Sequence, residues 1–140
     1  MEKKYYTFLN ANKCVGSNDN EFIGVTTMVT VSNFKDKMVG ETPLVSGRAA
    51  IANRSNILTT VLGQEITPDE NGNVWVDVTF WGERADRFKK YLNGRERVRL
   101  FLTGVLTSHE YTRNDGTTGV GVGIKVTDWT SAEFRAKDGE

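Results

Sequence analysis

The segment Val74-Trp75-Val76-Asp77-Val78-Thr79-Phe80-Trp81-Gly82 has the most regular pattern in this chain of 140 residues. It alternates with period two, so that one side holds Val74, Val76, Val78 and Phe80, and the other holds Trp75, Asp77, Thr79 and Trp81. Successive side chains of a β-strand point to opposite faces, which predicts a strand with one core face. Trp75 and Trp81 then lie on the polar, outward face, where two indoles need an explanation.

The neighbouring segments predict four further strands and one helix. The strands cover residues 25–32, 44–53, 98–102 and 120–127. The helix covers residues 83–92 and stops at Asn93-Gly94, and the turn Asn114-Asp115-Gly116 indicates a hairpin between the last two strands. Five strands with a helix between the third and fourth is the layout of the OB barrel. The sequence therefore predicts an all-β fold, a five-stranded OB-fold barrel with one helix between strands 3 and 4, plus an N-terminal extension.

The length fits a single folded domain. We expect residues 1–22 to form an N-terminal extension, in which Tyr5 to Leu9 is a candidate edge strand. Residues 23–130 are the predicted OB-fold domain that binds single-stranded nucleic acid, and residues 131–140 are a short C-terminal tail.

Composition limits the possible functions. Lys and Arg total 18, as do Asp and Glu, whereas proteins dedicated to duplex DNA are usually basic. The charge is uneven, however, because residues 83–99 hold seven bases against three acids. Cys14 is the single cysteine, so we expect a reducing, cytoplasmic location. No stretch approaches the roughly 20 apolar residues that span a bilayer, so no membrane partner is expected.

The outward tryptophans suit a platform for unpaired bases, because every base has a π-face that can stack on an aromatic ring. Cations on neighbouring surfaces would bind the phosphates. Arg97, Arg99 and Phe101 fall on the non-core side of the strand after the helix, and Arg48 and Arg54 fall on one side of the strand over 44–53. Glycines at 121 and 123 would keep the last strand low enough for a chain to cross it.

Three consecutive segments resemble the bacterial single-stranded-DNA-binding protein family. They are residues 75–82 (WVDVTFWG), residues 88–94 (FKKYLNG) and residues 98–106 (VRLFLTGVL). In that family a strand with Trp, five residues, an aromatic and Gly precedes a helix that ends in Tyr-Leu-Lys-Lys-Gly. A strand ending in Gly-x-Leu follows, and then a long hairpin that bears an aromatic, equivalent here to Tyr111.

The resemblance implies base stacking by Trp75, Trp81 and Tyr111, and phosphate contacts by Arg48, Arg54, Arg99 and Arg113. Arg97, Phe101 and His109 complete the predicted DNA-binding set, with His109 able to stack on a base or bind a phosphate. The family is usually a homotetramer that coats single strands in DNA replication, recombination and repair. We therefore expect single-stranded DNA as the partner and a homo-oligomer, a tetramer or a dimer.

The sequence departs from the family at three places. No stacking aromatic occurs near Ile57-Leu58, and the acidic turn at Asp69-Glu70 should repel a phosphate chain. The chain ends at residues 135–140 without a Gly/Pro/Gln-rich tail and acidic tip. We thus expect a divergent member that does not recruit repair enzymes through such a tip.

The sequence gives little support for catalysis or for metal binding. His109 and Cys14 are the only residues of their kinds, so a zinc site is not expected, and no nucleophile is paired with a base. The sequence predicts a protein that is not an enzyme and has no cofactor or metal. Two alternatives remain open: an OB-fold protein-interaction module with its aromatic face buried in an interface, and single-stranded RNA binding.

Overall fold

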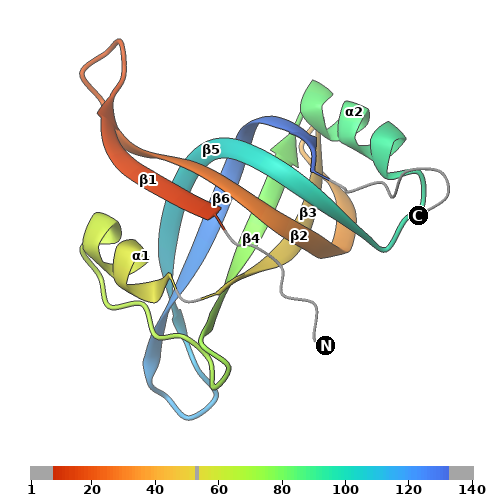
Figure 1. The fold of residues 1–140 in the computed structure, drawn as a ribbon. Helices are drawn as coiled ribbons and strands as arrows, with labels where there is room; N and C mark the ends of the chain where they lie inside the picture. Colours follow the sequence, from red (N-terminus) through yellow and green to blue (C-terminus); the bar gives the residue numbers. More distant parts are fainter. Residues whose placement is uncertain (1–7, 53, 133–140) are drawn as a thin grey trace, which may run out of the picture.

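Six strands form one curved sheet with a helix at either end of it (Figure 1). The computed structural model describes residues 8–52 and 54–132. In chain order, the elements are β1 (Phe8–Val15), β2 (Glu21–Val39), β3 (Thr42–Ala52), α1 (Ser55–Leu62), β4 (Asn73–Trp81), α2 (Glu83–Leu92), β5 (Arg97–Thr112) and β6 (Thr118–Ser131).

The sheet closes into a barrel because β2 pairs with β5 as well as with β3. The closure can be followed through one row of paired residues: Arg97, Ser32, Arg48, Asp77, Gly123 and Thr107. This row leaves β5 at Arg97 and returns to β5 at Thr107, ten residues further along the strand. Such a stagger is what tilts the strands of a closed barrel relative to its axis.

The predicted all-β OB-fold barrel is confirmed. Its five strands are β2 to β6, and the predicted helix is α2, which lies between the third and fourth of them. The helix has the predicted bounds, and it ends where Asn93 and Gly94 adopt positive φ angles of 45° and 78°. Both residues tolerate this left-handed conformation, which stops a helix.

The inward side chains of β4 all belong to the hydrophobic core. Val74, Val76, Val78 and Phe80 are all buried. The Phe80 ring stacks on the ring of Phe88 from α2, with centroids 3.9 Å apart and planes 5° apart. This contact packs α2 against the inward face of β4 at one end of the barrel.

The structure differs from the prediction in two further elements. β1 runs over Phe8–Val15, beyond the expected edge strand at 5–9, and residues 1–7 lie outside the described residues. β1 pairs with β2 along its length and buries Leu9 and Ala11, so it belongs to the same sheet as the barrel. The short helix α1 was not predicted, and it buries Leu58. Neither α1 nor α2 is long and apolar enough to cross a membrane.

Candidate nucleic-acid interface

A groove of about 1000 Å³ lies on the outward face of the barrel. Trp75 borders it from β4, whereas Arg95, Arg97 and Arg99 border it from the start of β5 and the turn before it. The strands between them contribute mainly small or short side chains: Ala50 and Ala52 from β3, and Thr30 and Ser32 from β2. The lining also includes Val29, Asn33 and the larger Phe34 from β2, and Glu96 beside the arginines. The sheet register fits this arrangement, because Ala50 pairs with Trp75 and Thr30 pairs with Arg99. The groove thus has Trp75 on one side, mainly small side chains between the two sides, and three arginines beside Glu96 on the other side.

The Trp75 side chain is exposed but not free. The residue keeps 44% of its surface in solvent, and its indole Nε1–H donates a hydrogen bond of 3.1 Å to Oδ2 of Asp69. The Arg48 guanidinium lies over the indole, 5.6 Å from the ring centroid. Arg48 also forms an ion pair with Asp77, at 3.6 Å. Trp75 is therefore held at its edge by a carboxylate and covered in part by a cation.

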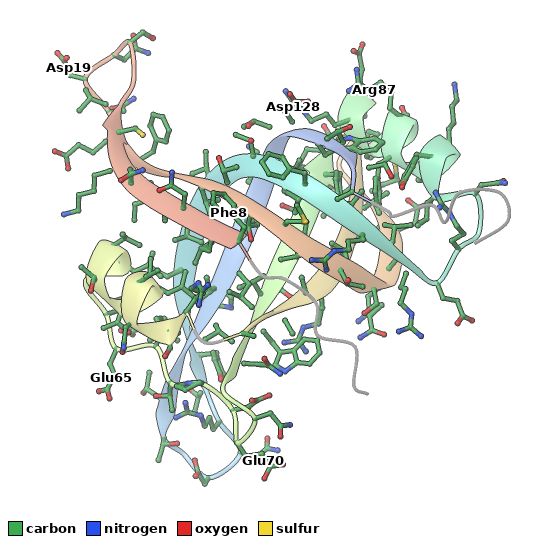
Figure 2. All side chains as sticks on the ribbon, viewed as in Figure 1. Phe8, Asp19, Glu65, Glu70, Arg87 and Asp128 are labelled. Atoms are coloured by element: carbon green, nitrogen blue, oxygen red, sulfur yellow. The ribbon has the colours of Figure 1, made fainter. Side chains whose placement is uncertain are left out.

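Asp69 is exposed in its turn, but its carboxylate accepts three hydrogen bonds. Its Oδ1 accepts backbone N–H bonds from Asn71 and Asn73, both at 2.9 Å, and its Oδ2 accepts the bond from Trp75. These bonds, led by the one from Asn73, lower the pKa of the Asp69 carboxyl from its ordinary value of 3.8. The loop that carries Asp69 and Glu70 joins α1 to β4 and runs beside the β5–β6 hairpin (Figure 2).

Arg97 and Arg99 reach the groove from β5, a strand that does not pair with β4 in the described sheet. β5 pairs with β2 and β6, so the two arginines are brought opposite Trp75 only by closure of the barrel. Arg99 donates a hydrogen bond of 3.1 Å to Oγ1 of Thr30. Arg95 was not among the predicted site residues, and it donates to the carbonyl of Tyr91 with its guanidinium 4.4 Å from the centroid of that ring. Only its place in the basic run over 83–99 could have suggested it.

Trp81 lies at the opposite end of β4 and outside this groove. It is half-buried, and its Nε1–H donates to Oγ1 of Thr79 at 3.2 Å. The Lys125 ammonium lies 5.7 Å from its ring centroid, because Lys125 pairs with Thr79 across β4 and β6. The parity argument placed both tryptophans on the outward face correctly, but they form two separate aromatic–cation pairs. Lys125 was not predicted, although its outward parity on the last strand was a usable signal.

Tyr111 and His109 lie on the β5–β6 hairpin, each opposite a glycine of β6. A Cβ atom added at Gly119 would lie 2.6 Å from the Tyr111 ring, and one added at Gly121 would lie 2.5 Å from the His109 ring. Both rings therefore lie across β6 in space that only glycine leaves open. Tyr111 remains 45% exposed, and the Arg113 guanidinium is 5.7 Å from its centroid. The hairpin thus carries a third aromatic–cation pair.

Two predicted residues lie elsewhere. Phe101 points outward from β5, but its ring stacks against Phe8 of β1, with centroids 6.4 Å apart, and it does not border the groove. Arg54 does not share a strand face with Arg48, because β3 ends at Ala52 and Arg54 is the residue that precedes α1. Strand parity cannot be extended past the end of the strand.

Over residues 8–52 and 54–132, no group of three or more His, Cys, Asp or Glu side chains is placed to hold a metal ion. Residues 135–140, on which the expectation about the missing acidic tip depends, lie outside the part of the chain that the structure describes.

No protein-family model and no curated protein matches the sequence. Among solved structures, the chain is similar to the small single-stranded DNA-binding protein from Streptomyces coelicolor, with a TM-score of 0.55 and 14% identity over 79% of this chain and 94% of that one. It is also similar to the mitochondrial single-stranded DNA-binding protein Rim1 from S. cerevisiae, with a TM-score of 0.48 and 12% identity over 80% and 96%. The first similarity shows that the barrel has the OB fold that single-stranded-DNA-binding proteins use.

Proposed function

We propose that this protein binds single-stranded DNA without strong sequence preference. Bases stack on Trp75, Trp81 and Tyr111, and cations beside these rings bind the phosphates. The groove between Trp75 and the arginines of β5 is the observation that carries the proposal, since it offers a base and its phosphates separate partners on one surface.

Physical chemistry favours an unpaired strand over a duplex at this groove. A duplex keeps its bases stacked inside, so an exposed indole can reach them only in a single strand. Each of the three aromatic residues has a cation within 6 Å of its ring: Arg48 at Trp75, Lys125 at Trp81 and Arg113 at Tyr111. Such pairs engage base and backbone together, and they do not require a high net charge over the whole protein.

The cations that we assign to phosphate contacts are Arg48, Arg97, Arg99 and Arg113, with Arg95 and Lys125 added from the structure. His109 joins Tyr111 as a second flat ring on the hairpin. Phe101 does not border the groove, since its ring stacks with Phe8, and we assign it no DNA contact.

We further propose that the protein protects single strands in DNA replication, recombination or repair, in the cytoplasm and as a homo-oligomer. The position of β1 supports self-association, because within the described sheet this strand pairs with β2 alone. An edge strand with an open backbone edge is a ready partner for a second chain.

A titration with a dT oligomer tests the proposed function. Tryptophan fluorescence should be quenched on binding, and the affinity should fall as the salt concentration rises. An RNA oligomer of the same length as competitor tests the alternative of RNA binding, which would show tighter binding of the RNA. Absence of quenching and of a mobility shift at low salt would contradict nucleic-acid binding and favour a protein-interaction module.

A further inference from the structure

We propose that Asp69 is a positioning residue that holds Trp75 ready for stacking, although its charge opposes the phosphates of the ligand. The inference rests on the proposed function, because it assigns a role in the binding of a single strand. It also reverses the expectation from the sequence, in which the acidic turn only weakens binding.

Hydrogen bonds within its own turn hold the Asp69 carboxylate in place, independently of its contact with the indole. Its Oδ1 accepts the N–H groups of Asn71 and Asn73, and the backbone of Asp69 adds a donated bond to Asn73 at 2.8 Å and an accepted bond from Gly72 at 3.0 Å. Four hydrogen bonds thus tie Asp69 to its own turn. Because Oδ1 is used in this way, Oδ2 is aimed at the Nε1–H of Trp75.

The hydrogen bond to Asp69 engages the Nε1–H at the edge of the indole, whereas a base would stack on the face of the ring. An exposed tryptophan without such a bond samples several rotamers, and binding must then order it at a cost in entropy. With the bond, the orientation of the ring is set in the free protein, beside the groove that Ala50 and Ala52 keep low. Asp69 therefore affects binding through Trp75 and need not touch the DNA.

The negative charge of Asp69 has the opposite effect on binding. Since three N–H donors point at the carboxylate, part of this charge is compensated locally. Repulsion and positioning therefore predict opposite changes in DNA affinity when Asp69 is neutralised. If repulsion dominates, neutralising Asp69 strengthens binding, and if positioning dominates, neutralising it weakens binding.

The experiment compares Asp69→Asn with Glu70→Gln, each titrated with a dT oligomer. In the Asp69→Asn variant, the amide side chain keeps an acceptor oxygen for the turn but presents an N–H₂ group toward the indole N–H. The bond to Trp75 is therefore lost while the charge is removed. Glu70 is the next residue and is exposed, so its substitution removes the same charge from the same turn. We expect Asp69→Asn to weaken binding by about 2- to 10-fold, the usual range for one lost hydrogen bond, and Glu70→Gln to leave it equal or stronger.

A double-mutant cycle separates positioning from any general effect on the fold. In a Trp75→Phe background no indole N–H exists, so adding Asp69→Asn should cause no further loss of affinity. In the DNA-free protein, the Nε1–H resonance of Trp75 should shift in Asp69→Asn and stay in place in Glu70→Gln.

The inference is overturned if both charge removals change the affinity alike, or if the loss from Asp69→Asn persists in the Trp75→Phe background. Failure of the proposed function looks different, because the unsubstituted protein would then not bind the oligomer at all.

Discussion

Arg48 and Asp77 face each other across β3 and β4, with Nε of the arginine 3.6 Å from Oδ1 of the aspartate. Both side chains are more than half exposed, and the same guanidinium lies over Trp75. Under the proposed function, Asp77 would therefore compete with a DNA phosphate for the Arg48 guanidinium.

This pairing predicts that Asp77→Asn strengthens binding. An exposed ion pair contributes about 0.2–1 kcal/mol, so its removal should free Arg48 for phosphate and raise the affinity about 1.5- to 5-fold at low salt. The thermal midpoint of unfolding should hardly change. An oligonucleotide titration of the variant checks this, and weaker or unchanged binding would show that Arg48 does not compete between carboxylate and phosphate.

Arg99→Ala should reduce the salt dependence of binding. Each phosphate contact with a single strand contributes about 0.7 to the slope of log affinity against log salt, so the slope should fall by about that amount. Arg99→Lys should restore it. Lys13→Ala is the control, because Lys13 is an exposed cation on β1 that does not border the groove. An equal loss of slope in the control would mean that the charge acts at long range and not through a contact.

Gly121→Ala should displace His109. The new Cβ would lie 2.5 Å from Cε1 of that ring, which cannot stay in place across β6. We expect weaker DNA binding and a shifted His109 Cε1–H resonance in NMR spectra. Gly16→Ala is a fair control, since its Cβ would meet only ordinary contacts, the nearest at 3.5 Å.

In a His109→Ala background, Gly121→Ala should cause no further loss of DNA affinity, because the His109 ring no longer occupies the space that the new Cβ needs. A loss that persists there would show that Gly121 is needed for the strand itself.

The Asp69–Trp75 contact has a defined pH dependence. Hydrogen bonds, first from Asn73 and then from Trp75 and Asn71, stabilise the carboxylate and keep its pKa below 3.8. A lowered pKa means that this stabilisation is complete above the pKa of the unfolded chain and disappears as the pH falls through the folded value. The Trp75 Nε1–H resonance should thus stay nearly constant from pH 8 to about 5 and then shift with a midpoint below pH 3.8. A midpoint above 3.8, or an identical acid shift in Asp69→Asn, would contradict this assignment.

The sequence predicted best where local pattern and tertiary role agree. β4 was predicted because its period-two pattern is also its burial pattern, from buried Val74 to buried Phe80. The helix α2 was predicted to the residue, since its apolar spacing and its stop at Asn93 reinforce each other.

The rest of the fold depends on contacts that no local pattern reveals. α1 has only eight residues, includes the β-branched Thr59, Thr60 and Val61, and is recognisable mainly through the burial of Leu58. The second half of β2 is charged from Lys35 to Lys37, and it is a strand because it pairs with β3 after a bulge.

Sequence parity predicted which faces the candidate residues occupy better than it predicted how these residues are arranged. Parity placed Trp75, Trp81 and Arg99 on outward faces, but only barrel closure brings Arg99 to the groove of Trp75 and leaves Trp81 outside it. The roles of Asp69 and Lys125 depend on side-chain contacts from other elements.

The role of Trp75 as a stacking platform is best tested by a dT-oligomer titration of Trp75→Ala beside the unsubstituted protein, with thermal unfolding measured on both. Stacking of one base contributes about 1–3 kcal/mol, so we expect the affinity to fall about 5- to 150-fold while the unfolding midpoint stays nearly constant. Unchanged affinity in a folded Trp75→Ala variant would contradict this role, and loss of the fold would show that the residue belongs to the core.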